Sequence, residues 1–100
     1  MLVIAGRVKV KPEMRAEAVQ AAVKMARASQ AESGCKSYGF YADLDDPNTF
    51  LIFEQWENDA ALMAHFQTPH MAEFNGLIPR FLAAPPSIDR YEVSAVVKMM

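Results

Sequence analysis

The sequence has few of the residues on which several classes of protein depend. It contains a single cysteine, Cys35, in 100 residues, so no internal disulfide can form and we expect a reducing, cytoplasmic setting. Ten Lys and Arg stand against twelve Asp and Glu, giving a net charge of -2, which argues against a nucleic-acid partner. No stretch approaches the roughly 20 apolar residues that span a bilayer. The first residues also lack the basic and long apolar regions of a secretory signal.

Motifs for nucleotides and metals are missing as well. Neither G-x-G-x-x-G nor G-x-x-x-x-G-K-[ST] occurs, so no phosphate-binding loop is encoded. The only two histidines, His65 and His70, are five residues apart with Pro69 between them. Histidines that bind a metal from one helix are three or four residues apart, so we expect no metal site from this pair. We expect Cys35 to be a small buried residue and not a nucleophile.

The sequence is rich, by contrast, in apolar residues. They make up 52% of the chain, slightly above the usual range of about 45–50%. Such a chain buries enough surface to offset the entropy lost on folding, and its length suffices for one hydrophobic core. We therefore expect one domain over residues 1–100.

The pattern of residues predicts four strands and two helices, the second in two pieces. Pro12 should open the first helix, which Gly34 ends in a left-handed conformation. Four segments have the composition or alternation of strands, namely 2–10, 35–43, 49–57 and 88–96. The order β-α-β-β-α-β predicts an α+β ferredoxin-like fold, in which a four-stranded antiparallel sheet has both helices on one face.

The second helical region shows clear start and stop signals. Asn58 can cap its first piece, and Thr68 followed by Pro69 is typical of a new N-terminus. Pro79 should kink or split the second piece.

The predicted strand 49–57 is apolar on both of its faces. Phe50 and Ile52 point to one side of the sheet, while Leu51 and Phe53 point to the other. Residues 2–5 behave in the same way. Because helices can cover only one face, we expect the sheet of a second subunit to cover the other, which predicts a homodimer.

A small group of polar and aromatic residues could carry chemistry. Glu54 and Trp56 share a face of their strand. Either Trp56 closes the core beside a solvated or arginine-paired Glu54, or the two form a pocket wall on which a flat ligand stacks. His65 is either a partly buried residue bonded to backbone or a participant in proton transfer. His70 lies near the start of its helix, where the dipole favours a neutral ring able to accept a proton. Tyr38 completes the group.

Several motifs, taken in order, make nearly the whole chain resemble the antibiotic biosynthesis monooxygenase family, which includes small bacterial quinol monooxygenases. The motifs are Val8-Lys9-Val10-Lys11-Pro12, Glu32-Ser33-Gly34-Cys35 leading to Tyr38, Asp43-Leu44-Asp45-Asp46-Pro47-Asn48-Thr49-Phe50, Glu54-Gln55-Trp56-Glu57, Ala64-His65, Thr68-Pro69-His70-Met71 and Tyr91.

The resemblance implies a dimeric α+β barrel with a pocket between each sheet and its helices. It also implies oxidation of a small aromatic substrate by O₂ without metal, flavin or other cofactor. In that picture Trp56 positions the substrate and His65 or His70 assists proton transfer, which makes these three the expected catalytic residues. The residues expected to bind substrate are Tyr38, Ile52, Glu54, Phe66 and Phe74.

Two positions depart from better-known branches of this family. Ile52 stands where polyketide-oxidising members have Asn, and Gly6 stands where haem-degrading members have Asn, so haem degradation is not expected. We expect a cofactor-independent monooxygenase that acts on a quinol-like or polyphenolic substrate. The alternative is a non-oxidative small-molecule binding protein or isomerase that uses the same pocket.

Overall fold

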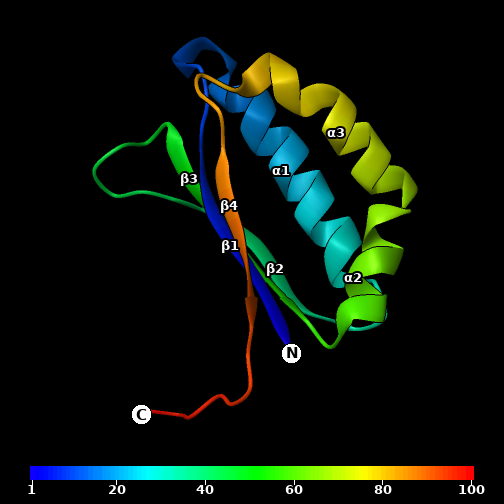
Figure 1. The fold of residues 1–100 in the computed structure, drawn as a ribbon. Helices are drawn as coiled ribbons and strands as arrows, with labels where there is room; N and C mark the ends of the chain where they lie inside the picture. The colour runs from blue at the N-terminus through cyan, green and yellow to red at the C-terminus, as the bar shows by residue number, and fades with distance from the viewer.

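Strands and helices follow one another in the predicted order. The computed structural model describes residues 1–100 and contains β1 (Leu2–Lys9), η1 (Pro12–Met14), α1 (Arg15–Gln30), β2 (Cys35–Ala42), β3 (Thr49–Trp56), α2 (Asp59–Phe66), α3 (Pro69–Phe81) and β4 (Ser87–Glu92). The strands form one antiparallel sheet in the order β2-β3-β1-β4. All three α-helices lie on one side of it (Figure 1). This confirms the predicted α+β ferredoxin-like fold. None of the helices combines the length and apolarity needed to cross a membrane.

The caps predicted for the second helical region are confirmed. The Asn58 side chain accepts a hydrogen bond from the N–H of Ala61 at 2.9 Å, at the start of α2. Thr68 Oγ1 accepts one from the N–H of Met71 at 3.2 Å, and Pro69 occupies the first turn of α3. These bonds satisfy N–H groups that the first turn of a helix leaves free.

The first helix and Pro79 differ from the prediction in detail. Pro12 begins a short 3-10 turn, η1, and α1 follows it. Gly34 has the expected left-handed φ of 82°, but it lies in the turn after α1 and does not itself end the helix. Pro79 does not split α3, which runs on to Phe81. Pro79 removes one helical hydrogen bond, the one to the carbonyl of Asn75, and only Arg80 and Phe81 follow it in the helix.

Strand β4 is shorter than predicted because its partner ends. Leu2 pairs with Glu92, and the last hydrogen bond runs from the N–H of Val93 to the carbonyl of Met1 at 2.9 Å. No residue of β1 remains to pair with positions 94–96. The chain therefore leaves the sheet as a tail, visible at the C-terminus in Figure 1. Four large apolar residues of this tail are exposed: Val96, Val97, Met99 and Met100.

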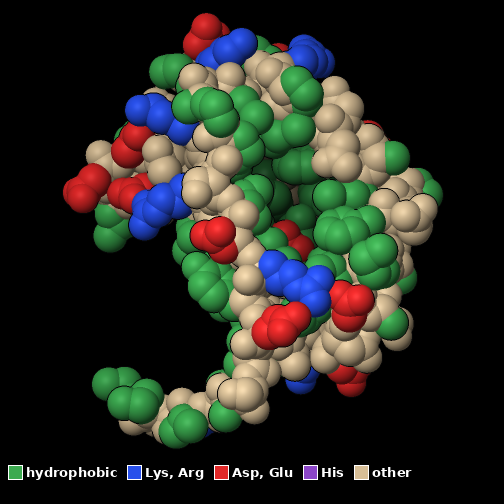
Figure 2. All heavy atoms as spheres, viewed as in Figure 1, with side chains coloured by type: hydrophobic (Ala, Val, Ile, Leu, Met, Phe, Trp, Pro, Cys, Tyr) green, Lys and Arg blue, Asp and Glu red, His purple; other side chains and the backbone are tan.

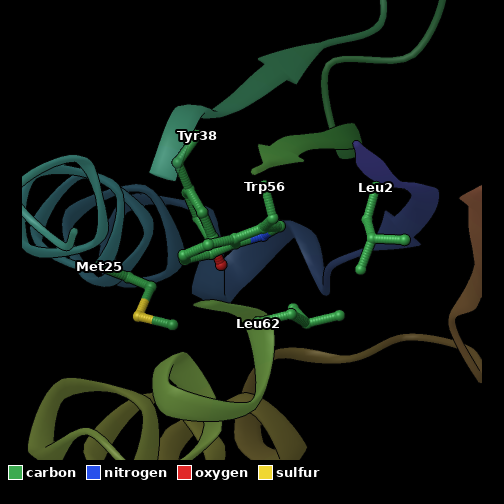
Figure 3. Packing of buried hydrophobic residues seen from close by; sticks show 5 residues of the cluster. All are labelled: Leu2, Met25, Tyr38, Trp56 and Leu62. Carbon is green, nitrogen blue, oxygen red and sulfur yellow. The ribbon is translucent and has the colours of Figure 1, made fainter. Parts of the chain in front are cut away.

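The hydrophobic core lies between the sheet and the helices and has two parts. Figure 3 shows the larger one, with Trp56 in the centre, sheet residues on one side and helix residues on the other; its members are Leu2, Met25, Tyr38, Trp56 and Leu62. The smaller part is formed by Val10, Ala18 and Phe81. The first part surrounds the residues that we consider below as a site.

The opposite face of the sheet has no helix over it. Strand alternation places six apolar residues there: Val3, Ala5, Tyr41, Leu51, Phe53 and Tyr91. Tyr41 is 56% exposed and Tyr91 is 51% exposed. Only 13 of the 100 residues are buried, although 52% are hydrophobic. Much of the apolar excess of the sequence therefore lies on this open face and on the tail.

Candidate functional site

Glu54 and Trp56 of β3 form a buried, hydrogen-bonded pair. Trp56 Nε1 donates to Glu54 Oε1 at 2.9 Å. Trp56 is fully buried, and Glu54 is only 7% exposed. Of the two roles considered for Trp56, the structure favours the first, in which it closes the core. Its ring has no free face on which a ligand could stack. Glu54 is hydrogen-bonded to the indole and forms no ion pair with an arginine.

The position of Glu54 changes its acidity. Burial raises its pKa to about 7, and the negative charge of Glu32 adds to this, while hydrogen bonds with Trp56 and Tyr38 act in the opposite direction. Tyr38 is the register partner of Glu54 on β2, and burial together with the Glu54 charge raises the pKa of its hydroxyl. A carboxyl group that titrates near neutral pH can both accept and release a proton there.

Three residues that are distant in sequence meet beside this pair. Glu32 Oε2 lies 2.6 Å from His65 Nδ1 and 2.7 Å from His70 Nε2. The His65 ring in turn lies 4.6 Å from the Trp56 ring and 5.5 Å from the Tyr38 ring, measured between centroids. The result is a continuous polar and aromatic network that runs from the turn after α1, through α2 and α3, to the sheet.

The turn that carries Glu32 is held tightly against α2. The N–H of Glu57 donates to the carbonyl of Gly34 at 2.8 Å. A Cβ atom at Gly34 would lie 2.6 Å from the Cβ of Ala61, so only glycine permits this approach, and the φ of 82° also favours it. The Gly34 backbone therefore brings the turn, with Glu32, close to the helix that bears His65.

The other residues predicted to bind substrate are divided between the core and the surface. Ile52 is buried on the same side of β3 as Glu54. Phe74 of α3 is partly buried, and its ring lies 5.8 Å from that of Phe40. Phe66, at the end of α2, is 47% exposed, and its ring lies 5.9 Å from that of its chain neighbour His65, so it is at the exposed edge of the network.

Glu32 is not among the site residues predicted from the sequence. Its two partners are 33 and 38 residues further along the chain, and no local pattern links positions so far apart. Glu32 entered only as part of a motif that supports the family resemblance. Cys35, three residues later, donates its thiol to the carbonyl of Ser37 at 3.6 Å. Burial raises its pKa to about 11, so it is not activated as a nucleophile.

Two openings flank the network. A cleft of about 330 Å³ lies between α1 and β2 and is lined mainly by hydrophobic residues. On the other side, Figure 2 shows a hollow between β4 and α3, again mainly hydrophobic, with an acidic side chain visible at its lower end. The strand register places Gly6 of β1 between Ile52 and Ile88. Ile88 is 45% exposed although it is on the helix-facing side, so it borders this second opening.

Three relatives have related sequences. The Synechocystis protein sll1783 is 43% identical over 93 residues, which are 93% of this chain and 63% of that protein. The Bacillus subtilis protein named "Putative monooxygenase YcnE" is 34% identical over 94% of this chain and 99% of its own length. A shorter match of 52 residues, 36% identical, covers 44% of this chain and 50% of the Escherichia coli protein named "Probable quinol monooxygenase YgiN". This chain thus spans less than two thirds of the first and third relatives.

The family profile and a solved structure agree with these relatives. The profile described as antibiotic biosynthesis monooxygenase matches residues 1–77. A crystal structure from Deinococcus radiodurans, described as a "putative antibiotic biosynthesis monooxygenase", superimposes with a TM-score of 0.92. It is 28% identical in sequence and is matched over 100% of this chain and 99% of its own.

Proposed function

The chain belongs to the antibiotic biosynthesis monooxygenase family, and on that premise we propose that it is a monooxygenase that oxidises a quinol-like or polyphenolic substrate with O₂ and without a cofactor. The observation that supports this most strongly is the buried Glu54, whose pKa of about 7 suits removal of a phenolic proton. The names of two relatives, which include a monooxygenase and a quinol monooxygenase, agree with this class of reaction.

The substrate ring occupies the hollow between β4 and α3 (Figure 2). Its apolar walls suit a flat aromatic molecule and keep water from the reacting groups. Glu54 pairs with Ile4, two residues along β1 from Gly6 on the same face of the sheet. Gly6 and its register partner Ile88 border this space. In this position the Glu54 carboxylate accepts a proton from a ring hydroxyl and leaves an electron-rich phenolate.

The phenolate itself then reduces O₂. One electron passes to O₂, and the resulting semiquinone and superoxide combine at the neighbouring ring carbon to form a hydroperoxide. The carbon that bears the hydroperoxyl group also bears a hydrogen atom. Loss of water from this carbon leaves a carbonyl group there. Quinol and O₂ become hydroxyquinone and water: one oxygen atom enters the ring, the other leaves as water, and the four electrons come from the substrate.

The roles of the other residues follow from their contacts. Trp56 acts as a positioning residue, because its Nε1–H holds Glu54 Oε1 and its ring is covered. We assign the first proton transfer to Glu54 because Glu32 already engages one nitrogen of His65 and one of His70. Tyr38 stays protonated beside Glu54, since its pKa is raised.

An oxygen electrode tests the reaction. Metal-free protein should consume O₂ faster than a buffer blank with at least one member of a hydroquinone series, and a hydroxyquinone should form in equal amount. Product formation that continues unchanged without O₂ would favour the isomerase alternative. O₂ uptake equal to the blank across the whole series would contradict the proposal.

Variants of the active protein test the roles. Glu54→Gln should lower kcat by roughly 10²–10⁴-fold, whereas the neighbouring exposed Glu57→Gln should not change it. Ile88→Trp should fill the hollow and raise KM, whereas Val23→Trp, which narrows the cleft beside α1, should leave KM unchanged. The opposite order of these two effects would place the substrate in the cleft.

We further propose that two copies of the chain pair through the open face of the sheet. That face bears apolar residues and no helix, and contiguous exposed apolar surface is rare on a monomer. Light scattering during size-exclusion chromatography should give twice the mass of 11.1 kDa. Leu51→Lys on the open face should yield monomer, while Val23→Lys on α1 should not. A wild-type monomer at micromolar concentration would refute the pairing.

A further inference from the structure

We propose that Glu32, His65 and His70 form a binding site for a divalent transition-metal ion, with Zn²⁺ as the ion that best fits the donors. Their donor atoms all lie within 4.8 Å of one another. Two imidazole nitrogens and one carboxylate oxygen are a donor set found around zinc where a fourth position stays open. As a pair on one helix, the two histidines have the wrong spacing for a metal site. They lie on two helices, and a distant turn supplies the third donor.

The present spacing is close to what the ion requires. Glu32 Oε2 lies 2.6 Å from His65 Nδ1 and 2.7 Å from His70 Nε2. A tetrahedral ion with bonds of about 2.0–2.2 Å separates its donors by roughly 3.4 Å. Each imidazole nitrogen therefore needs to move away from the carboxylate oxygen by about 0.7 Å. The two imidazole nitrogens, now up to 4.8 Å apart, also need to approach each other by about 1.4 Å. The ion takes the place of the hydrogen bonds between these groups, and each imidazole binds it through a nitrogen that carries no proton.

The backbone holds the two histidines at a fixed separation. Thr68 Oγ1 donates to the carbonyl of His65 at 2.7 Å and accepts from the N–H of Met71 at 3.2 Å. One side chain thus ties the end of α2 to the first turn of α3, in which His70 lies. The tight turn at Gly34 fixes Glu32 from the other side, so the three donors are in place before an ion arrives.

Burial distinguishes this group from the acidic clusters common on protein surfaces. The side chains of His65, Glu32 and His70 are 1%, 14% and 20% exposed. The greater exposure at His70 gives the ion an entry path and leaves space for water as a fourth ligand. The Trp56 and Tyr38 rings lie against the His65 ring and limit how far its imidazole can turn.

The bound ion would add a direct link between three parts of the fold that already contact one another. These parts are the turn after α1, the end of α2 and the start of α3. The inference concerns binding only and does not depend on the proposed oxidation. A titration without substrate therefore tests it whether or not the protein turns over quinols.

The test uses tag-free protein stripped with a chelator and then dialysed. Calorimetric titration with ZnCl₂ should show one ion per chain, and Co²⁺ should give the visible absorption typical of a four-coordinate site. Glu32→Gln and His70→Ala should each weaken Zn²⁺ binding by at least about tenfold. Glu73→Gln is the matched control, because Glu73 is an exposed acid on the same helix as His70 and pairs with Lys24. It should bind as the wild type does.

Two outcomes would overturn the inference. One is a wild-type protein that shows neither heat of binding nor a Co²⁺ spectrum. The other is wild-type binding that either variant retains within about twofold while circular dichroism shows the variant to be folded, because the ion would then lie elsewhere. The two variants change different elements, the turn after α1 and α3, so a folding defect in one leaves the other informative.

Discussion

Glu54→Gln removes the only buried carboxyl group of the chain and should change how stability depends on pH. In the folded protein the pKa of Glu54 is about 7, against an ordinary value of 4.5. Between these two pH values the folded chain keeps a proton that the unfolded chain has lost, so the free energy of unfolding falls as pH rises. One pKa unit corresponds to about 1.36 kcal/mol, so the loss amounts to about 3 kcal/mol by pH 7. Glutamine does not ionise and escapes this loss.

Urea titrations at a series of pH values from 4.5 to 8 measure the effect, at one fixed protein concentration. Trp56 is the single tryptophan, so its fluorescence reports unfolding directly. The free energy of unfolding of the wild type, minus that of Glu54→Gln, should decline by about 3 kcal/mol across this range. The same difference taken against Glu57→Gln, an exposed neighbour, should stay flat. A flat difference for Glu54→Gln as well would mean that burial does not hold this carboxyl protonated, and the proposed base would lose its physical support.

Three further predictions follow from local contacts. Trp56→Phe removes the hydrogen bond that lowers the pKa of Glu54, so in an active enzyme the acid limb of the kcat/KM profile should move to higher pH; an unmoved limb would separate Trp56 from the base. Gly6→Ala would place a Cβ 2.3 Å from the carbonyl oxygen of Ser87 and should lower the free energy of unfolding by about 1–3 kcal/mol. Gly76→Ala meets nothing within 4 Å and should raise it by about 0.5–1 kcal/mol, so equal urea midpoints for the two alanine variants would contradict the close approach at Gly6. Thr68→Ala should lower the free energy of unfolding by about 1 kcal/mol, because the first turn of α3 loses its cap; an unchanged urea midpoint would show that the cap contributes nothing.

Local sequence signals predicted the elements and many of their ends. Alternation and β-branched residues predicted the strands, and side-chain caps at Asn58 and Thr68 predicted where α2 and α3 begin, because such bonds join residues only three positions apart. The end of β4 could not be predicted in this way. It depends on where β1 begins, at the other end of the chain, and no alternation within residues 88–96 carries that information.

The site residues, too, could be predicted from the sequence only in part. Glu54 and Trp56 were selected from their residue types and their spacing on one strand, and Tyr38, His65 and His70 from residue type and predicted position. The structure brings all five into one network. Phe66 was expected to bind substrate as an apolar residue of the second helical region, but it lies at an exposed helix end, because helical periodicity alone does not say how far the covering layer extends.

The sequence by itself determined the fold class, since hydrophobic periodicity and caps act between neighbours along the chain. Only the tertiary structure decided that Glu32 meets both histidines, that the Trp56 ring is covered, and that the pKa of Glu54 rises to about 7. Each of these depends on burial or on contacts between distant segments. Desolvation and long-range charge act through space, so a carboxyl group acquires its functional acidity only when the sheet and the helices close around it.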